Sequence, residues 1–144
     1  MASFKHMSDK SREALYLLFR IIIGAFFFFH GLGKIMPGFG GPGDVTKFAA
    51  FGAFGLVWLA YIIAIGEMTV GLGVLTGVYS RLVSLGGATI MLGAMIFAHF
   101  PKGWNPLSNG SELPLLFLAA FMIVFIYGGG EYGLEKLTFK KETF

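Results

Sequence analysis

The sequence has no cysteine among its 144 residues, and only 13% of its residues are charged. Without cysteine, the chain cannot form disulfides, thiolate nucleophiles, iron–sulfur clusters or cysteine-ligated zinc. An ordinary soluble domain is about 25% charged, whereas 56% of this chain is hydrophobic. The net charge of +3 is small and lacks the clustered basic face that nucleic acid requires. We therefore expect an integral membrane protein that lies in a lipid bilayer and has no nucleic-acid partner.

The apolar residues fall into four runs, at about 15–35, 56–78, 82–100 and 113–130. A helix of about 20 residues crosses the hydrocarbon core. Only Tyr79, Ser80 and Arg81 separate the second and third runs, so these two must form an antiparallel hairpin. The segment 44–54 is too short to span and is expected to be an interfacial or re-entrant helix. The polar residues 1–13 are expected to form a short tail or an interfacial turn. The sequence thus predicts an all-α, four-helix transmembrane bundle, with residues 1–144 forming a single membrane domain.

Lys and Arg are unequally divided between the two sides of this predicted bundle. The side with both termini has seven, and the other side has three: Lys5, Lys10, Arg12, Arg81, Lys136, Lys140 and Lys141 against Lys34, Lys47 and Lys102. Cytoplasmic loops carry the excess of these residues. Both termini are therefore expected to be cytoplasmic.

Four ionisable residues lie inside the first two apolar runs: Arg20, His30, Lys34 and Glu67. A charge at a helix centre costs about 2.5 to 3.5 kcal/mol, so such residues face a protein interior or a wet cavity. At about 100° per residue, Arg20 and Lys34 share one helix stripe with Phe27, and His30 lies near it. From its depth in the span, Arg20 is expected to reach Glu67. This pair either holds the bundle together without chemistry or forms part of a proton or quinone site.

His30 and His99 are expected at similar depths near the outer face, with Lys34, Asn109 and Glu112 above them. Such a polar mouth suits a quinone head group or a small anion. Two histidines with no obvious third ligand make a poor metal or haem site, so neither a metal nor a haem is expected. Ordinary hydrogen bonding of both rings is the alternative.

Several short motifs occur in an order that resembles the DoxX family of small four-helix membrane proteins. They are Arg20, Gly24, the His-Gly-Leu-Gly-Lys of 30–34, Glu67, the glycine-rich 71–73, the Gly-Val-Tyr-Ser-Arg of 77–81 and the Asn-Gly-Ser-Glu of 109–112. The resemblance covers about residues 15–130. It implies a membrane fold and a mixed set of functions, since some relatives are subunits of a thiosulfate:quinone oxidoreductase and others associate with redox-defence or sulfur-metabolism partners.

The resemblance and the buried charges together predict a small subunit of a redox complex in the inner membrane of a bacterial or archaeal cell. It would handle quinone or protons, with quinone as its cofactor, other redox subunits as its partners, and self-association left open. Glu67 would exchange a proton and Arg20 would keep it ionised. The quinone or anionic substrate would contact His30, Lys34, His99, Asn109 and Glu112. The rival prediction is a structural or assembly subunit without chemistry. Transport of small solutes is less favoured, because four spans without an internal repeat give little scope for alternating access.

Overall fold

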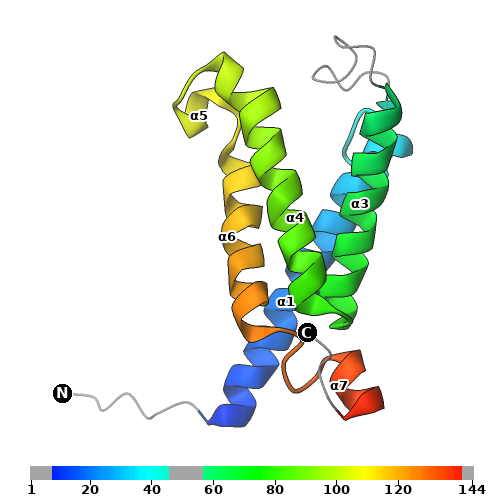
Figure 1. Cartoon of the computed structure of the whole chain (residues 1–144), viewed down its shortest axis with the longest axis vertical. Coiled ribbons are helices and arrows are strands. Elements are labelled where there is room, and N and C mark those ends of the chain that lie inside the picture. Colours follow the sequence, from blue (N-terminus) through cyan, green and yellow to red (C-terminus); the bar gives the residue numbers. More distant parts are fainter. Residues whose placement is uncertain (1–7, 46–56, 141–144) are drawn as a thin grey trace, which may run out of the picture.

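The computed structural model describes residues 8–45 and 57–140, and every regular element within them is helical. In chain order the helices are α1 (Asp9–Ile35), α3 (Val57–Thr76), α4 (Ser80–Ala94) with its continuations η2 (Met95–His99) and η3 (Phe100–Lys102), α5 (Pro106–Asn109), α6 (Glu112–Tyr127) and α7 (Leu134–Phe139) (Figure 1). Nearly all of the interfacial helix predicted at 44–54 lies outside the described residues.

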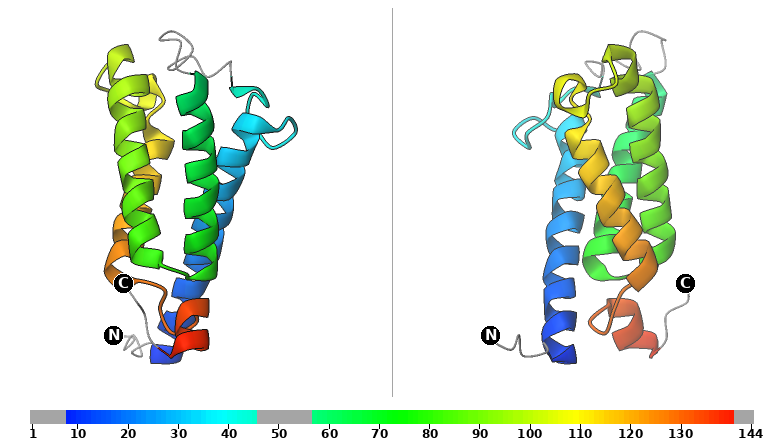
Figure 2. Two further views of the ribbon diagram at one scale, coloured as in Figure 1. Left: turned by 45° about the vertical axis from the view of Figure 1, so that its right-hand side comes forward. Right: turned by 90° about the vertical axis from the view of Figure 1, so that its left-hand side faces the viewer.

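Four of these helices are apolar and form the bundle (Figures 1 and 2). α1, α3 and the continuous stretch Ser80–Lys102 are each long and apolar enough to cross a membrane. α6 is equally apolar but has 16 residues. The prediction of an all-α membrane bundle is confirmed.

Local caps set the first helix boundary. The Ser8 hydroxyl accepts a hydrogen bond from the backbone N–H of Ser11, and Asp9 places a negative charge in the first turn. Both features stabilise a helix N-terminus. α1 therefore starts at Asp9, six residues before the apolar run that suggested its start at about 15, and the polar residues 9–13 are helix rather than tail.

α1 and α3 form one close pair, and α4 and α6 form the other. Glycines bring the backbones of the first pair together. A Cβ on Gly24 would lie 2.5 Å from the backbone nitrogen of Leu75, and one on Gly71 would lie 2.5 Å from that of Phe28. Small residues at helix contacts are the usual way to pack helices where lipid removes the hydrophobic driving force. These two glycines therefore fix the register of α1 against α3.

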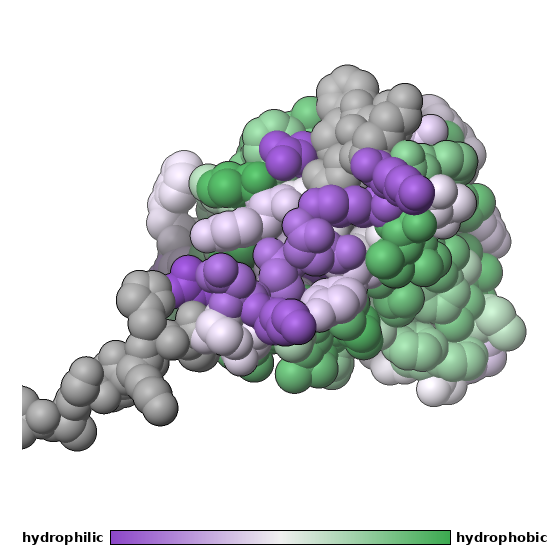
Figure 3. Space-filling view, turned by 90° about the horizontal axis from the view of Figure 1, so that it is seen from below, coloured by the Kyte–Doolittle hydropathy of each residue, from purple (hydrophilic) through white to green (hydrophobic). Residues whose placement is uncertain are grey.

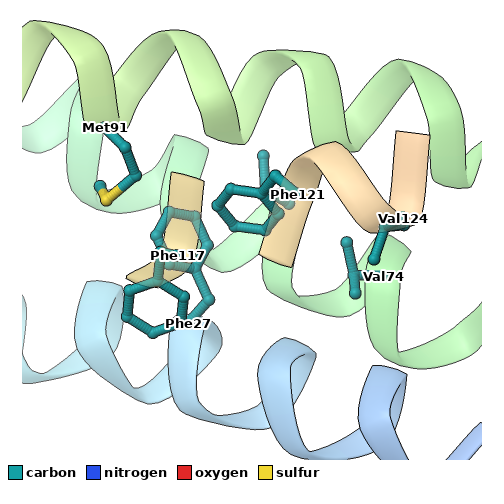
Figure 4. Packing of buried hydrophobic residues seen from close by; sticks show 7 residues of the cluster. Phe27, Val74, Met91, Phe117, Phe121 and Val124 are labelled. Carbon is teal, nitrogen blue, oxygen red and sulfur yellow. The ribbon is translucent and has the colours of Figure 1, made fainter. Parts of the chain in front are cut away.

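A cluster of buried apolar side chains joins the two pairs (Figure 4). The Phe27 ring meets those of Phe117 and Phe121 edge-on, with centroids 4.9 and 4.7 Å away. The other members are Val70, Val74, Met91 and Val124. Edge-to-face aromatic pairs each contribute about 0.5 to 1.5 kcal/mol beyond area burial. Phe27, on α1, therefore links this helix to α6 at the centre of the bundle.

The start of α1, the α3–α4 turn and α7 lie at the same end of the bundle (Figures 1 and 2). Figure 3 looks onto this end and shows hydrophilic residues gathered there, with hydrophobic residues around them. The opposite end carries the α1 C-terminus, α5 and the start of α6. Which end faces the cytoplasm stays a prediction.

Candidate functional site

A buried carboxylate on α3 meets two basic side chains from α1. Glu67 is 1% exposed. Its Oε1 accepts a hydrogen bond from Lys34 Nζ, and its Oε2 lies 3.2 Å from Nδ1 of His30. The Lys34 side chain is also buried, whereas that of His30 is 36% exposed. We call these three residues the Glu67 site.

The local sequence explains why these groups meet. His30 and Lys34 are four residues apart, so they occupy successive turns on one side of α1. Gly31 lies between them against α3, where a Cβ would be 2.6 Å from the carbonyl oxygen of Ala64 and 3.0 Å from Cβ of Glu67. Because Gly31 has no side chain, Glu67 can enter the space between the two basic groups.

The charges of the site offset one another. An unpaired carboxylate buried in apolar surroundings would be strongly destabilising, and Lys34 supplies the opposite charge. The carboxylate can only accept hydrogen bonds, so His30 contacts it through a protonated Nδ1. The partly exposed His30 ring also lines the cleft, so it lies between the buried carboxylate and the protein surface.

A cleft of about 460 Å³ opens beside this site. His30 and Lys34 supply its charged groups, whereas Glu67 lies behind them and is not part of the lining. The other described lining residues are Phe26, Phe29, Phe39, Gly40, Gly41, Pro42, Leu113 and Phe117. A ligand in the cleft would therefore meet aromatic walls and two hydrogen-bonding side chains.

Arg20 does not pair with Glu67, so that prediction is wrong. The guanidinium is fully buried, and its Nη1 donates to the carbonyl oxygen of Val74 at 3.1 Å. Val74 lies seven residues beyond Glu67, roughly 10 Å along the axis of α3. The register that packs Gly24 against Gly71 places Arg20 opposite Val74 and Gly77.

His99 and Asn109 meet each other at a separate place, in the loop between α4 and α6. His99 Nδ1 donates to the Asn109 carbonyl oxygen at 3.0 Å. The buried Asn109 side chain donates to the Gly103 carbonyl and accepts from the N–H of Ser111. Glu112 is exposed at the start of α6. None of these three lines the cleft beside His30, so the structure divides the predicted polar mouth in two.

A second buried carboxylate, Glu135, lies in α7, and no sequence pattern indicated it. Glu135 is 4% exposed, and its Oε2 accepts a hydrogen bond from the backbone N–H of Tyr79 at 2.9 Å. Tyr79 has a φ of 47°, in the left-handed region that a non-glycine residue rarely adopts. Glu135 thus holds α7 against the α3–α4 turn. The loop between α6 and α7 is held by Tyr16, whose hydroxyl donates a hydrogen bond to the Gly128 carbonyl oxygen at 2.6 Å.

His30 and Lys34 are the side chains best placed to hold a cofactor head group, because both line the cleft. Across residues 8–45 and 57–140, no three side chains of His, Asp or Glu gather as metal ligands. The predictions about metal and haem stay predictions.

Comparison with known proteins identifies the family. The DoxX family profile matches residues 15–100. The chain is 32% identical over 133 residues, 92% of either sequence, to a Bacillus subtilis (strain 168) protein named "Putative oxidoreductase CatD". No solved structure matches the chain. Together with the apolar helices, these matches confirm the family that the motifs predicted, and the chain belongs to the DoxX family of integral membrane proteins.

Proposed function

We propose that this protein is a membrane subunit of a quinone-linked redox complex, which binds a quinone head group in the cleft and exchanges protons through the Glu67 site. One observation carries the proposal: a fully buried carboxylate is paired with Lys34 and with a partly exposed His30, and both basic residues line the cleft. The name of the Bacillus subtilis relative supports a redox role. In this proposal, a partner subunit carries the electron donor.

The proposed chemistry follows from the order of the groups. Reduction of a quinone to a quinol takes two electrons and two protons, and each carbonyl oxygen becomes a hydroxyl. Lys34 can donate a hydrogen bond to such an oxygen, and Nε2 of His30 can do so when both ring nitrogens carry a proton. His30 lies between the cleft and Glu67, so a proton can pass between the ligand oxygen, the imidazole and the carboxylate. Positioned acid–base groups of this kind typically contribute about 10² to 10⁴ in rate.

The test compares His30→Ala and Glu67→Gln with the matched control His99→Ala, a histidine that bonds outside the cleft. Purified proteins in nanodiscs are titrated with quinone, and quinone-linked redox activity is measured in membranes of the parent cell. We expect both site variants to lose quinone binding and activity, whereas His99→Ala keeps both. Thermal unfolding of each variant separates loss of function from loss of fold. Absence of quinone binding by the wild-type protein would refute the proposal.

A structural role for the same residues is the second candidate, because both sets of polar contacts join α1 to α3. Lys34 bonds to Glu67, and Arg20 bonds to the Val74 carbonyl. Replacing a buried ion pair by apolar residues of similar size often preserves or raises stability. The double variant Lys34→Met with Glu67→Leu therefore distinguishes the candidates. Full complex activity in this variant would favour an assembly subunit.

For location, we propose the inner membrane of a bacterial or archaeal cell, with both termini in the cytoplasm. The support is the excess of Lys and Arg at the end that carries the start of α1 and α7. In this orientation the Glu67 site lies toward the outer face.

A further inference from the structure

An entirely apolar groove continues from the cleft. It has a volume of about 190 Å³, and its described lining is Ile23, Phe26, Leu113, Leu116 and Phe117. Three of these residues, Phe26, Leu113 and Phe117, also line the cleft beside His30. The cleft and the apolar groove are therefore neighbouring parts of one lined surface.

The groove follows the line where α1 and α6 face each other with few contacts. From His30 to Ile23 is seven residues, or roughly 10 Å along the axis of α1. Phe26 and Leu116, one from each wall, are 67% and 68% exposed. Both belong to apolar membrane helices, so the groove opens sideways toward lipid.

We propose that the cleft and the groove form one head-and-tail site for a lipid-borne quinone, whose ring lies against His30 and Lys34 and whose apolar tail lies between α1 and α6. This inference rests on the proposed function and adds the class of ligand and its route. A tail-less quinone or a small anion would use the charged end alone and leave the groove unfilled. The ligand enters sideways from the bilayer.

The chemistry of the lining supports a tail in this position. The charged groups, His30 and Lys34, line the cleft and not the groove, and the five groove residues offer no side-chain hydrogen-bond partner. Since a tail in lipid is already in apolar surroundings, the groove adds packing and orientation rather than a large hydrophobic gain. Filling the groove should therefore act by steric exclusion of the tail.

The experiment uses the full chain in nanodiscs and two quinones with the same ring, ubiquinone-0 without a tail and decylubiquinone with a ten-carbon tail. Leu116→Trp fills the groove, and Ile62→Trp is the matched control, since Ile62 is 56% exposed on α3 and lies outside the groove lining. Each quinone competes with a photoreactive quinone for labelling of the protein. Thermal unfolding is followed for every variant, with Leu116→Phe as a milder replacement if the tryptophan variant fails to fold.

We expect Leu116→Trp to weaken the binding of decylubiquinone about tenfold and to leave the binding of ubiquinone-0 unchanged. Ile62→Trp should change the binding of neither quinone. Unchanged decylubiquinone binding in Leu116→Trp would overturn the tail groove and leave the proposed function standing. Failure of both quinones to bind the wild-type protein would overturn the proposed function as well. Loss of a co-purifying phospholipid from Leu116→Trp, with decylubiquinone unaffected, would assign the groove to a lipid chain and refute the inference.

Discussion

Gly24 of α1 and Gly71 of α3 lie face to face, so that a Cβ on either one would be 2.7 Å from the carbonyl oxygen of the other. This contact fixes how far α1 is shifted along α3. Gly31 lies about two turns beyond Gly24 on α1. The same register places Gly31 against Glu67. The Glu67 site is therefore positioned by glycines that have no chemical role of their own.

The first prediction concerns this contact. Gly24→Ala and Gly71→Ala should each destabilise the protein by about 1 to 3 kcal/mol, the usual cost of overpacking. Gly93→Ala is the matched control, because a Cβ there would meet nothing within 4 Å. Thermal unfolding in detergent measures the effect. Equal melting temperatures for all three variants would contradict the assigned register.

The second prediction concerns the buried ion pair. Lys34→Met leaves Glu67 buried without its cationic partner, which should cost about 3 to 5 kcal/mol. Adding Glu67→Leu removes the uncompensated carboxylate and should restore most of this stability. The measurement is a double-mutant cycle from thermal unfolding of the four proteins. Additive effects of the two substitutions would show that the side chains are not coupled.

A third prediction concerns the attachment of α7. Glu135→Ala removes the acceptor of the Tyr79 N–H and should increase hydrogen exchange at Tyr79 and along α7, because a buried donor left unpaired costs about 1 to 3 kcal/mol. Glu131→Ala is the control: its ion pair with Lys136 is largely exposed, and such pairs contribute about 1 kcal/mol or less. Equal exchange in the two variants would argue against a fastening role for Glu135.

The fourth prediction concerns orientation. Green fluorescent protein fused after Phe139 should fluoresce, and alkaline phosphatase fused at the same place should be inactive, because the termini are proposed to be cytoplasmic. Alkaline phosphatase fused after Gly41, at the opposite end of α1, should be active. The reverse pattern would invert the proposed topology and place the Glu67 site toward the cytoplasm.

Helical periodicity was sufficient to predict which faces of the first two spans are buried. Arg20, Phe27 and Lys34 all lie on the buried side of α1, and Glu67 lies on the buried side of α3. The partner of Glu67 was beyond sequence reasoning. Depth estimated from the ends of the spans placed Arg20 near it, whereas backbone contacts at glycines set the register and bring Lys34 there instead.

The divided polar mouth follows from the helix pairing, because His30 is on α1, which packs against α3, whereas His99 follows α4, which packs against α6. The helix from Ser80 changes to a π-helical turn at Met95–His99, where the N–H of Phe100 bonds to the carbonyl of Met95. Such a turn adds a residue to the helical repeat and rotates the later residues about the helix axis, and composition alone does not reveal it. The role of Glu135 was equally hidden, because a hydrogen bond from the backbone N–H of Tyr79 leaves no signature in the sequence.

The short length of α6 has a consequence for the bilayer. Its 16 residues extend roughly 24 Å, several ångströms less than the hydrocarbon thickness of about 30 Å. Local thinning of the membrane is one way to relieve a hydrophobic mismatch of this kind. Leu113 and Phe117, on the first turns of α6, line the cleft, so the thinned bilayer would lie beside its opening. Water would then approach His30 more closely than in an undistorted membrane, and protons would have a shorter way to the buried carboxylate.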